Sequence, residues 1–233
     1  MTDDLRRDHR VIVPDRLGYA RTGGRAGGFA ANANAVAKLV VALGADRALV
    51  AGHSWAGGVA MEMALDFPAR VTGLVLVSSV APSGPVARMD RVLARPVVGS
   101  ALTAVTLSAA GRALSWGPSR ALAGRRWQRH HQELAEMATS WRRPSTWDSF
   151  ALEQRALVRE LPLLAPRLAA IAAPTVVLVG SSDRVVGLVS GQQLSSRIPG
   201  AVLDVVDGAG HLLPQLEPDR VASAIRRLAA LTS

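Results

Sequence analysis

The chain of 233 residues contains no cysteine, which excludes a disulfide framework and a thiolate zinc site. It also contains no apolar run long enough to cross a membrane. The uncharged stretch at residues 96–111 is short and carries hydroxyl groups and glycine, so we expect a buried or lid helix there. The first ten residues are charged and hold no apolar signal core. These absences predict a cytoplasmic protein that does not contact a membrane.

Lysine is nearly absent as well, because Lys38 is the only one and arginine carries the rest of the formal charge of +9. The arginines are scattered, no run is longer than two, and no aromatic residues alternate with them. We therefore interpret the charge as a bias of composition, and we expect a small-molecule substrate rather than nucleic acid as the partner. The oligomeric state is left open. The length allows one substantial core with room for an insertion.

Residues 47–58 place one serine in a turn of small residues directly after an apolar segment, with Gly-His-Ser-Trp-Ala at positions 52–56. A strand that runs through such a turn into a helix exposes the serine hydroxyl above the sheet edge, which is the geometry of a nucleophile elbow. Ala56 replaces the usual second glycine, a small change that a helix N-terminus tolerates. The alternative interpretation of Ser54 is a structural or phosphate-binding turn.

A serine is a weak nucleophile without a base and an orienting acid, and candidates for both follow along the chain. Residues 174–183 form an apolar, β-branched run, typical of a strand buried on both faces, which ends in a polar turn with Asp183. Residues 201–211 repeat this pattern and place His211 in a glycine-rich loop. Because the carboxyl ends of parallel strands share one edge, we expect Ser54, Asp183 and His211 to converge there.

Two other acids compete with Asp183 for this role. Asp204 lies inside the predicted strand, and Asp207 is expected to fix the loop, so neither is preferred. His53 precedes the serine and is expected to pack behind the elbow in a structural role.

The chain resembles the α/β-hydrolase superfamily in several segments besides the elbow. Residues 10–22 resemble the strand and turn before the elbow helix, residues 71–79 resemble the next strand, and residues 211–222 resemble the last loop and helix. The order serine, aspartate, histidine is also the order of this superfamily. The resemblance implies an α/β fold: a mostly parallel, doubly wound sheet with a helical cap insertion, lacking the first strands.

The same resemblance implies the roles of the site residues. Ser54 is expected to be the nucleophile, His211 the base and Asp183 the acid that orients it, while the backbone N–H of Trp55 stabilises the oxyanion. No metal or organic cofactor is implied.

The sequence changes character between residues 82 and 165, where helical patterns rich in alanine, leucine and arginine replace the strands. Helices are expected near residues 87–95, 101–115, 118–138 and 147–160. We therefore predict three segments: the first part of the hydrolase core at 1–81, a helical cap at 82–165, and the second part of the core at 166–233.

Four of the five tryptophans lie in the predicted cap: Trp116, Trp127, Trp141 and Trp147. With Trp55 beside the nucleophile, they predict an apolar substrate pocket that faces Ser54. The alternative interpretation is that a small helical cap uses large aromatic side chains to fill its own core.

The second donor of the oxyanion hole is not found in this sequence. In the superfamily it often follows a His-Gly dipeptide, and none occurs here. The strand of that region would lie between a strand at residues 11–13 and the strand at residues 49–51. We expect the chain to be an N-terminally shortened form of a working hydrolase, and one lost donor costs about 3 kcal/mol of transition-state stabilisation.

The sequence thus predicts a serine hydrolase of a small apolar ester, thioester or related acyl compound. Haloalkane dehalogenases and epoxide hydrolases need a carboxylate nucleophile, which Ser54 is not. Carbon–carbon bond hydrolysis, perhydrolysis and acyl transfer stay open within the same fold. A weak or inactive member that binds an apolar small molecule is the alternative from a different class.

Overall fold

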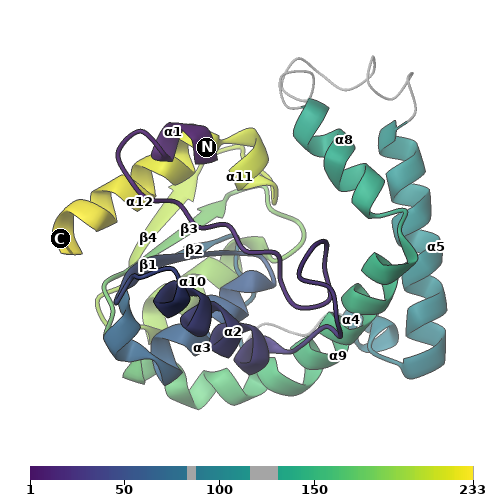
Figure 1. Ribbon diagram of the computed structural model, residues 1–233, viewed down its shortest axis with the longest axis horizontal. Coiled ribbons are helices and arrows are strands. Elements are labelled where there is room, and N and C mark those ends of the chain that lie inside the picture. Colours follow the sequence, from purple (N-terminus) through teal and green to yellow (C-terminus); the bar gives the residue numbers. More distant parts are fainter. Residues whose placement is uncertain (83–87, 116–130, 233) are drawn as a thin grey trace. The chain divides into compact units, whose positions relative to one another are not determined.

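The computed structural model describes residues 1–82, 88–115 and 131–232. Its centre is a sheet of four parallel strands in the order β1-β2-β3-β4 (Figure 1). The strands are β1 (Ala48–His53), β2 (Val71–Val77), β3 (Thr175–Gly180) and β4 (Val202–Val206). A parallel sheet with helical connections confirms the predicted α/β fold class.

The two inner strands are apolar on both faces because helices cover both sides of the sheet. All but one of the seven residues of β2 are buried, and β3 has the same pattern. The outer strands β1 and β4 are more exposed. Val75, Val77 and Leu178 belong to a core cluster that also includes Val221 and Leu228 of the last helix. Full burial of side chains of this size stabilises the fold by about 1.5–3 kcal/mol each.

Helices lie on both faces of this sheet. Figure 1 shows α1 (Thr2–Leu5) and α12 (Pro218–Thr232) on one face, and α2 (Phe29–Ala42), α3 (Ala56–Asp66) and α10 (Gly187–Arg197) on the other. The part of the chain that contains the sheet also includes the short helix α11 (Leu213–Leu216) and the 3-10 helices η1 (Pro68–Arg70) and η2 (Ala165–Ala170). The arrangement is a doubly wound sheet.

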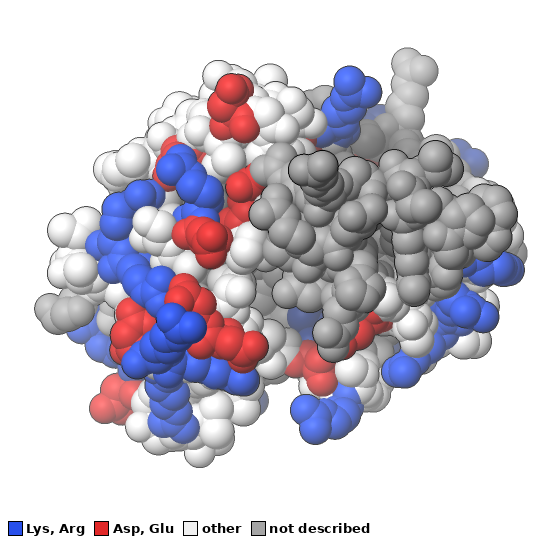
Figure 2. Space-filling model, turned by 90° about the horizontal axis from the view of Figure 1, so that it is seen from above, with Lys and Arg blue, Asp and Glu red and all other residues white. Residues whose placement is uncertain are grey.

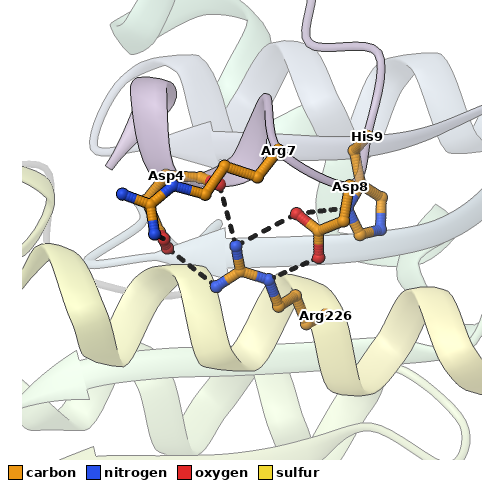
Figure 3. Close-up of polar contacts among 5 residues, drawn as sticks. All are labelled: Asp4, Arg7, Asp8, His9 and Arg226. Carbon is orange, nitrogen blue, oxygen red and sulfur yellow. Dashed lines mark hydrogen bonds and ion pairs between the residues drawn. The ribbon is translucent and has the colours of Figure 1, made fainter.

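One arginine joins the first and last helical regions of the chain (Figure 3). Arg226 of α12 donates from Nε to Asp8 Oδ2 over 2.7 Å and from Nη1 to Asp4 Oδ2 over 2.7 Å. A further N–H of the same guanidinium reaches the backbone carbonyl of Asp4 over 3.0 Å. The hydrogen bonds from Arg226 lower the pKa of both carboxyl groups, which therefore stay ionised beside the arginine.

Within its described residues, the chain divides into two compact units. The first consists of Met1–Pro14, Gly28–Pro85 and Arg159–Ser233, and it contains the sheet. The second consists of Asp15–Gly27 and Val86–Val158. Its helices are α4 (Arg88–Leu93), α5 (Pro96–Ser115), α8 (His131–Ser140) and α9 (Pro144–Leu164), the last of which continues into the first unit.

The second unit differs from the predicted cap at 82–165 in two ways: it contains residues 15–27, and its other part has the limits 86–158. Its helices agree with the helical pattern read from the sequence, except that residues 116–130 lie outside the described part. The role of this unit as a cap stays a prediction.

A buried carboxylate holds the 15–27 segment within the second unit. Glu153 of α9 has a side chain that is only 2% exposed. It accepts hydrogen bonds from Arg16 Nε over 2.7 Å, from Arg16 Nη2 over 3.1 Å and from the Tyr19 hydroxyl over 2.7 Å. Burial and the adjacent Glu153 carboxylate raise the pKa of Tyr19, so its hydroxyl keeps the proton that it donates. Ser149 of the same helix donates to the Gly18 carbonyl over 2.7 Å.

The strand expected at residues 11–13 is not formed, and this expectation was wrong. The segment has no regular structure, and Val13 is 71% exposed. A strand exists only where a neighbour satisfies its backbone N–H and C=O groups, and among the described residues β1 pairs with β2 alone. An apolar, β-branched sequence therefore does not suffice to form a strand here.

The uncharged stretch at 96–111 forms most of α5, as a helix was expected there. In the described part of the chain, no helix combines the length and the hydropathy that a membrane crossing requires. The cytoplasmic location stays a prediction.

Acidic and basic side chains are intermixed on the left of the face shown in Figure 2. Some of the basic groups are directly paired. Arg220 and Arg227 donate to the carboxylate of Asp204 over 3.2 Å and 2.9 Å, and Arg167 donates to Glu62 over 3.0 Å. Local pairing agrees with charge as a bias of composition, and the absence of a nucleic-acid partner stays a prediction.

Candidate active site

Ser54 lies in a sharp turn between β1 and α3. Its φ of +54° is in the left-handed region, which non-glycine residues rarely occupy and which is typical of strained functional turns. Two backbone hydrogen bonds hold this conformation: Ser54 N–H donates to the Val77 carbonyl over 3.0 Å, and Gly57 N–H donates to the Ser54 carbonyl over 3.0 Å. The turn therefore has the geometry of the predicted nucleophile elbow.

The glycines around Ser54 are required by close approaches of other groups. A Cβ on Gly52 would lie 2.6 Å from the backbone oxygen of Ala56. A Cβ on Gly57 would lie 1.6 Å from Ser79 Oγ, and one on Gly58 would lie 2.5 Å from the Phe29 ring. By contrast, Ala56 opens α3 without such a conflict, so the position where alanine replaces the usual glycine is one that accepts a side chain.

Asp183 lies in the turn that follows β3, and its side chain is 0% exposed. Its Oδ1 accepts hydrogen bonds from the N–H groups of Val185 (2.8 Å) and Val186 (3.1 Å). Burial by itself would disfavour the carboxylate. The hydrogen bond and charge of His211, with the two backbone donors, outweigh burial and lower the pKa of Asp183 to about 2. Asp183 is therefore ionised at neutral pH.

His211 lies in a loop after β4 that is held at the end of β3. Ser182 N–H donates to the Ala209 carbonyl over 2.9 Å, and Ser181 Oγ both donates to Asp207 and accepts from Gly208 N–H. A Cβ on Gly180 would lie only 2.2 Å from the Ala209 oxygen, so the loop crosses directly over this glycine. Asp207 thus fixes the loop, which is the role expected for it.

The three side chains lie within hydrogen-bond distance of one another. His211 Nδ1 is 3.0 Å from Asp183 Oδ2, and His211 Nε2 is 2.9 Å from Ser54 Oγ. The His211 side chain is 15% exposed, so solvent reaches the imidazole, whereas the Asp183 carboxylate that it contacts is not exposed to solvent. The ionised Asp183 fixes the proton of the ring on Nδ1 and leaves Nε2 as the acceptor that faces the serine hydroxyl. The geometry allows proton transfer from Ser54 to His211.

Trp55 is the N-terminal cap residue of α3, and its side chain is buried, with an exposed fraction of 8%. Its ring packs against Phe29 with the centroids 4.7 Å apart. Trp141 and Trp147 belong to the second unit, where Trp147 Nε1 donates to the Trp141 carbonyl over 2.7 Å.

The other two predicted pocket residues, Trp116 and Trp127, lie outside the residues that the structure describes. The apolar pocket over Ser54 therefore stays a prediction. Among the described residues, no group of three or more histidine, cysteine, aspartate or glutamate side chains is arranged to hold a metal ion.

Two contacts near the site were not foreseen from the sequence. His53 Nε2 lies 2.9 Å from the backbone oxygen of His211, and the Phe29 ring contacts Trp55. His53 was expected to pack behind the elbow, but its hydrogen-bond partner lies 158 residues away in the chain and has no local signal. Phe29 has no local signal, since it is a single aromatic residue at a helix start.

Comparison with known proteins identifies the family of the chain. A sequence model of the alpha/beta hydrolase family matches residues 1–224, and the chain belongs to that family. It is 28% identical over 238 residues to 2-hydroxymuconate semialdehyde hydrolase of Pseudomonas putida, which covers 95% of this chain and 77% of the relative. A thermophilic esterase from Thermogutta terrifontis has a TM-score of 0.73 and 25% identity, covering 99% of this chain and 84% of the esterase.

An uncharacterized protein of Mycobacterium tuberculosis is 25% identical over 230 residues, or 93% of this chain. The match covers 66% of that relative, so the chain spans about two thirds of its length.

Proposed function

We propose that the chain is a serine hydrolase that acts on a small apolar ester, thioester or related acyl compound. Membership of the alpha/beta hydrolase family, with an esterase and another hydrolase among the similar proteins, supports an enzyme of the hydrolase type. The observation that carries the finer proposal is the 2.9 Å distance between Ser54 Oγ and His211 Nε2, with Asp183 on the other ring nitrogen.

In the proposed reaction, Ser54 Oγ attacks the acyl carbon and its proton passes to His211 Nε2. The ionised Asp183 accepts the Nδ1–H and stabilises the imidazolium that forms. The N–H of Trp55, at the N-terminus of α3, stabilises the oxyanion of the tetrahedral intermediate. His211 then gives the proton to the leaving group, and water hydrolyses the acyl-enzyme by the same steps in the other direction, with His211 as general base.

Hydrolysis of a carbon–carbon bond is the second candidate. The similarity to 2-hydroxymuconate semialdehyde hydrolase favours it. Incubation with that semialdehyde and with p-nitrophenyl esters of short acids compares the two reactions. Faster consumption of the semialdehyde would favour the second candidate.

A fluorophosphonate probe tests whether the chain is an enzyme of this kind, because it reacts with serine hydroxyls that a base activates. We expect stoichiometric labelling of the folded protein and loss of labelling in Ser54→Ala. Ser79→Ala is the matched control, because it removes another buried serine hydroxyl near the elbow, and it should keep the label. A folded protein that takes up no probe and hydrolyses no ester would indicate a binding protein and overturn the proposal.

A further inference from the structure

The proposed nucleophile and base follow the two outer strands of the four-stranded sheet. Ser54 follows β1 and His211 follows β4, while β2 and β3 lie between them. The loop that carries His211 must therefore extend across the ends of two strands to reach the serine. The Ala209 region of this loop is bound at the end of β3, as described above. Those contacts hold the loop at β3, but none of them reaches β1 or the elbow.

His53 makes a direct connection between these two parts of the site. It is the last residue of β1, and its Nε2 lies 2.9 Å from the His211 carbonyl oxygen. The two imidazole rings have centroids 5.0 Å apart and are tilted by 40°. The same carbonyl also accepts the N–H of Leu213 over 3.0 Å, at the start of α11. The backbone of the base is thus held from the elbow on one side and from the following helix on the other.

We propose that His53 is a positioning residue that sets the distance between His211 and Ser54. This inference rests on the proposed function of the same site. A carbonyl oxygen only accepts, so His53 Nε2 must carry the proton in this contact. Because His53 and Ser54 are adjacent in the chain, any movement of the elbow carries the donor with it. The His211 backbone follows, and the 2.9 Å contact between its Nε2 and Ser54 Oγ is kept.

Two amide variants separate this role from packing. In His53→Gln, the longer side chain places its amide N–H close to the position of Nε2, so it can still donate to the His211 carbonyl. In His53→Asn, the amide has the same chemistry but is one methylene shorter and does not reach. His9→Asn, in the bend that follows α1 and with a side chain that is 34% exposed, is the matched control for a histidine lost elsewhere. Thermal unfolding and the fraction of protein labelled by fluorophosphonate measure folding.

The readout is kcat per labelled site and KM for a p-nitrophenyl ester. We expect His53→Asn to lower kcat roughly tenfold with KM unchanged, because one backbone-fixing hydrogen bond is lost and the near-attack geometry loosens. We expect His53→Gln and His9→Asn to stay within about twofold of the wild type. A purely structural His53 would lower the labelled fraction and the Tm, and would leave kcat per labelled site unchanged.

Two outcomes contradict the inference: equal kcat in the Asn variant and the wild type, or equal losses in Asn and Gln. A wild-type protein that neither takes up the probe nor hydrolyses the ester would instead refute the proposed function. The two failures are therefore distinguishable.

Discussion

Substitution of Gly180 by alanine should displace His211, the proposed base, without changing that residue itself. Gly180 ends β3, and an added Cβ would lie 2.2 Å from the Ala209 oxygen, 2.6 Å from the Ala209 carbonyl carbon and 2.8 Å from the Gly210 oxygen. All three atoms are backbone, so no side-chain rotation relieves the contact. Ordinary contact begins near 3.4 Å, and the loop must therefore retreat by about 1.2 Å.

His211 follows this loop segment directly, and a shift of this size is comparable to the tolerance of its 2.9 Å contact with Ser54. A misplacement of about 1 Å costs on the order of 10²-fold in rate. We expect Gly180→Ala to lower kcat/KM for a p-nitrophenyl ester by roughly 100-fold, and the rate of fluorophosphonate labelling by a similar factor. Overpacking of this kind costs about 1–3 kcal/mol, so the protein should still fold at 25 °C.

Gly210→Ala is the matched control, because Gly210 lies in the same loop and a Cβ there has nothing within 4 Å. We expect this variant to stay within about threefold of the wild type. Wild-type kinetics in Gly180→Ala would contradict this prediction, since they would show that the loop position does not control the distance between His211 and Ser54.

Three further predictions concern other parts of the chain. Asp183→Asn should lower kcat roughly 10⁴-fold. The folded protein lowers the pKa of Asp183 from 3.8 to about 2, so this carboxylate stabilises the fold by about 2 kcal/mol above pH 4, and the stabilisation is lost as the pH falls towards 2. Chemical denaturation should therefore show that the stability advantage of the wild type over Asp183→Asn shrinks between pH 4 and pH 2. Gly57→Ala should lower the Tm by several degrees, because the added Cβ conflicts with Ser79. The double variant Gly57→Ala with Ser79→Gly should recover most of the loss, and additive effects of the two substitutions would contradict this prediction. Arg16→Met should destabilise the fold by about 3 kcal/mol in urea unfolding, because it removes the arginine charge that pairs with the buried Glu153 carboxylate. Arg16→Met with Glu153→Leu should be milder, and an equally unstable double variant would contradict this.

The local elements were predictable where the pattern and the environment agree. Apolar runs bounded by turns predicted β2 and β3, since strands with both faces covered need apolar side chains at nearly every position. The same reasoning failed at residues 11–13, because strand formation depends on a neighbouring strand, and sequence pattern does not report one. Helical patterns in the sequence predicted helices in the second unit. Residues 15–27 also belong to this unit, and they contact it through Glu153, which is distant in the sequence and was therefore not predicted.

The sequence predicted which residues form the candidate site, but it did not predict the contacts that position them. Ser54, Asp183 and His211 each follow a strand, so the topology alone places them at one sheet edge. The contacts around them depend on close approaches at Gly52 and Gly180 and on the hydrogen bond between His53 and the His211 carbonyl. A glycine that permits a close approach and one that ends a turn look alike in a sequence, because the approaching group comes from elsewhere in the chain.

Activation of Ser54 by His211 is tested most directly by the site and rate of reaction with fluorophosphonate. Both are measured by mass spectrometry of the labelled peptide, in the wild type and in His211→Gln. We predict a single modification on Ser54 and a labelling rate that falls by about 10³-fold or more in the variant, since the serine then has no base. Modification at another residue, or an unchanged rate without the imidazole, would contradict the claim that His211 activates Ser54.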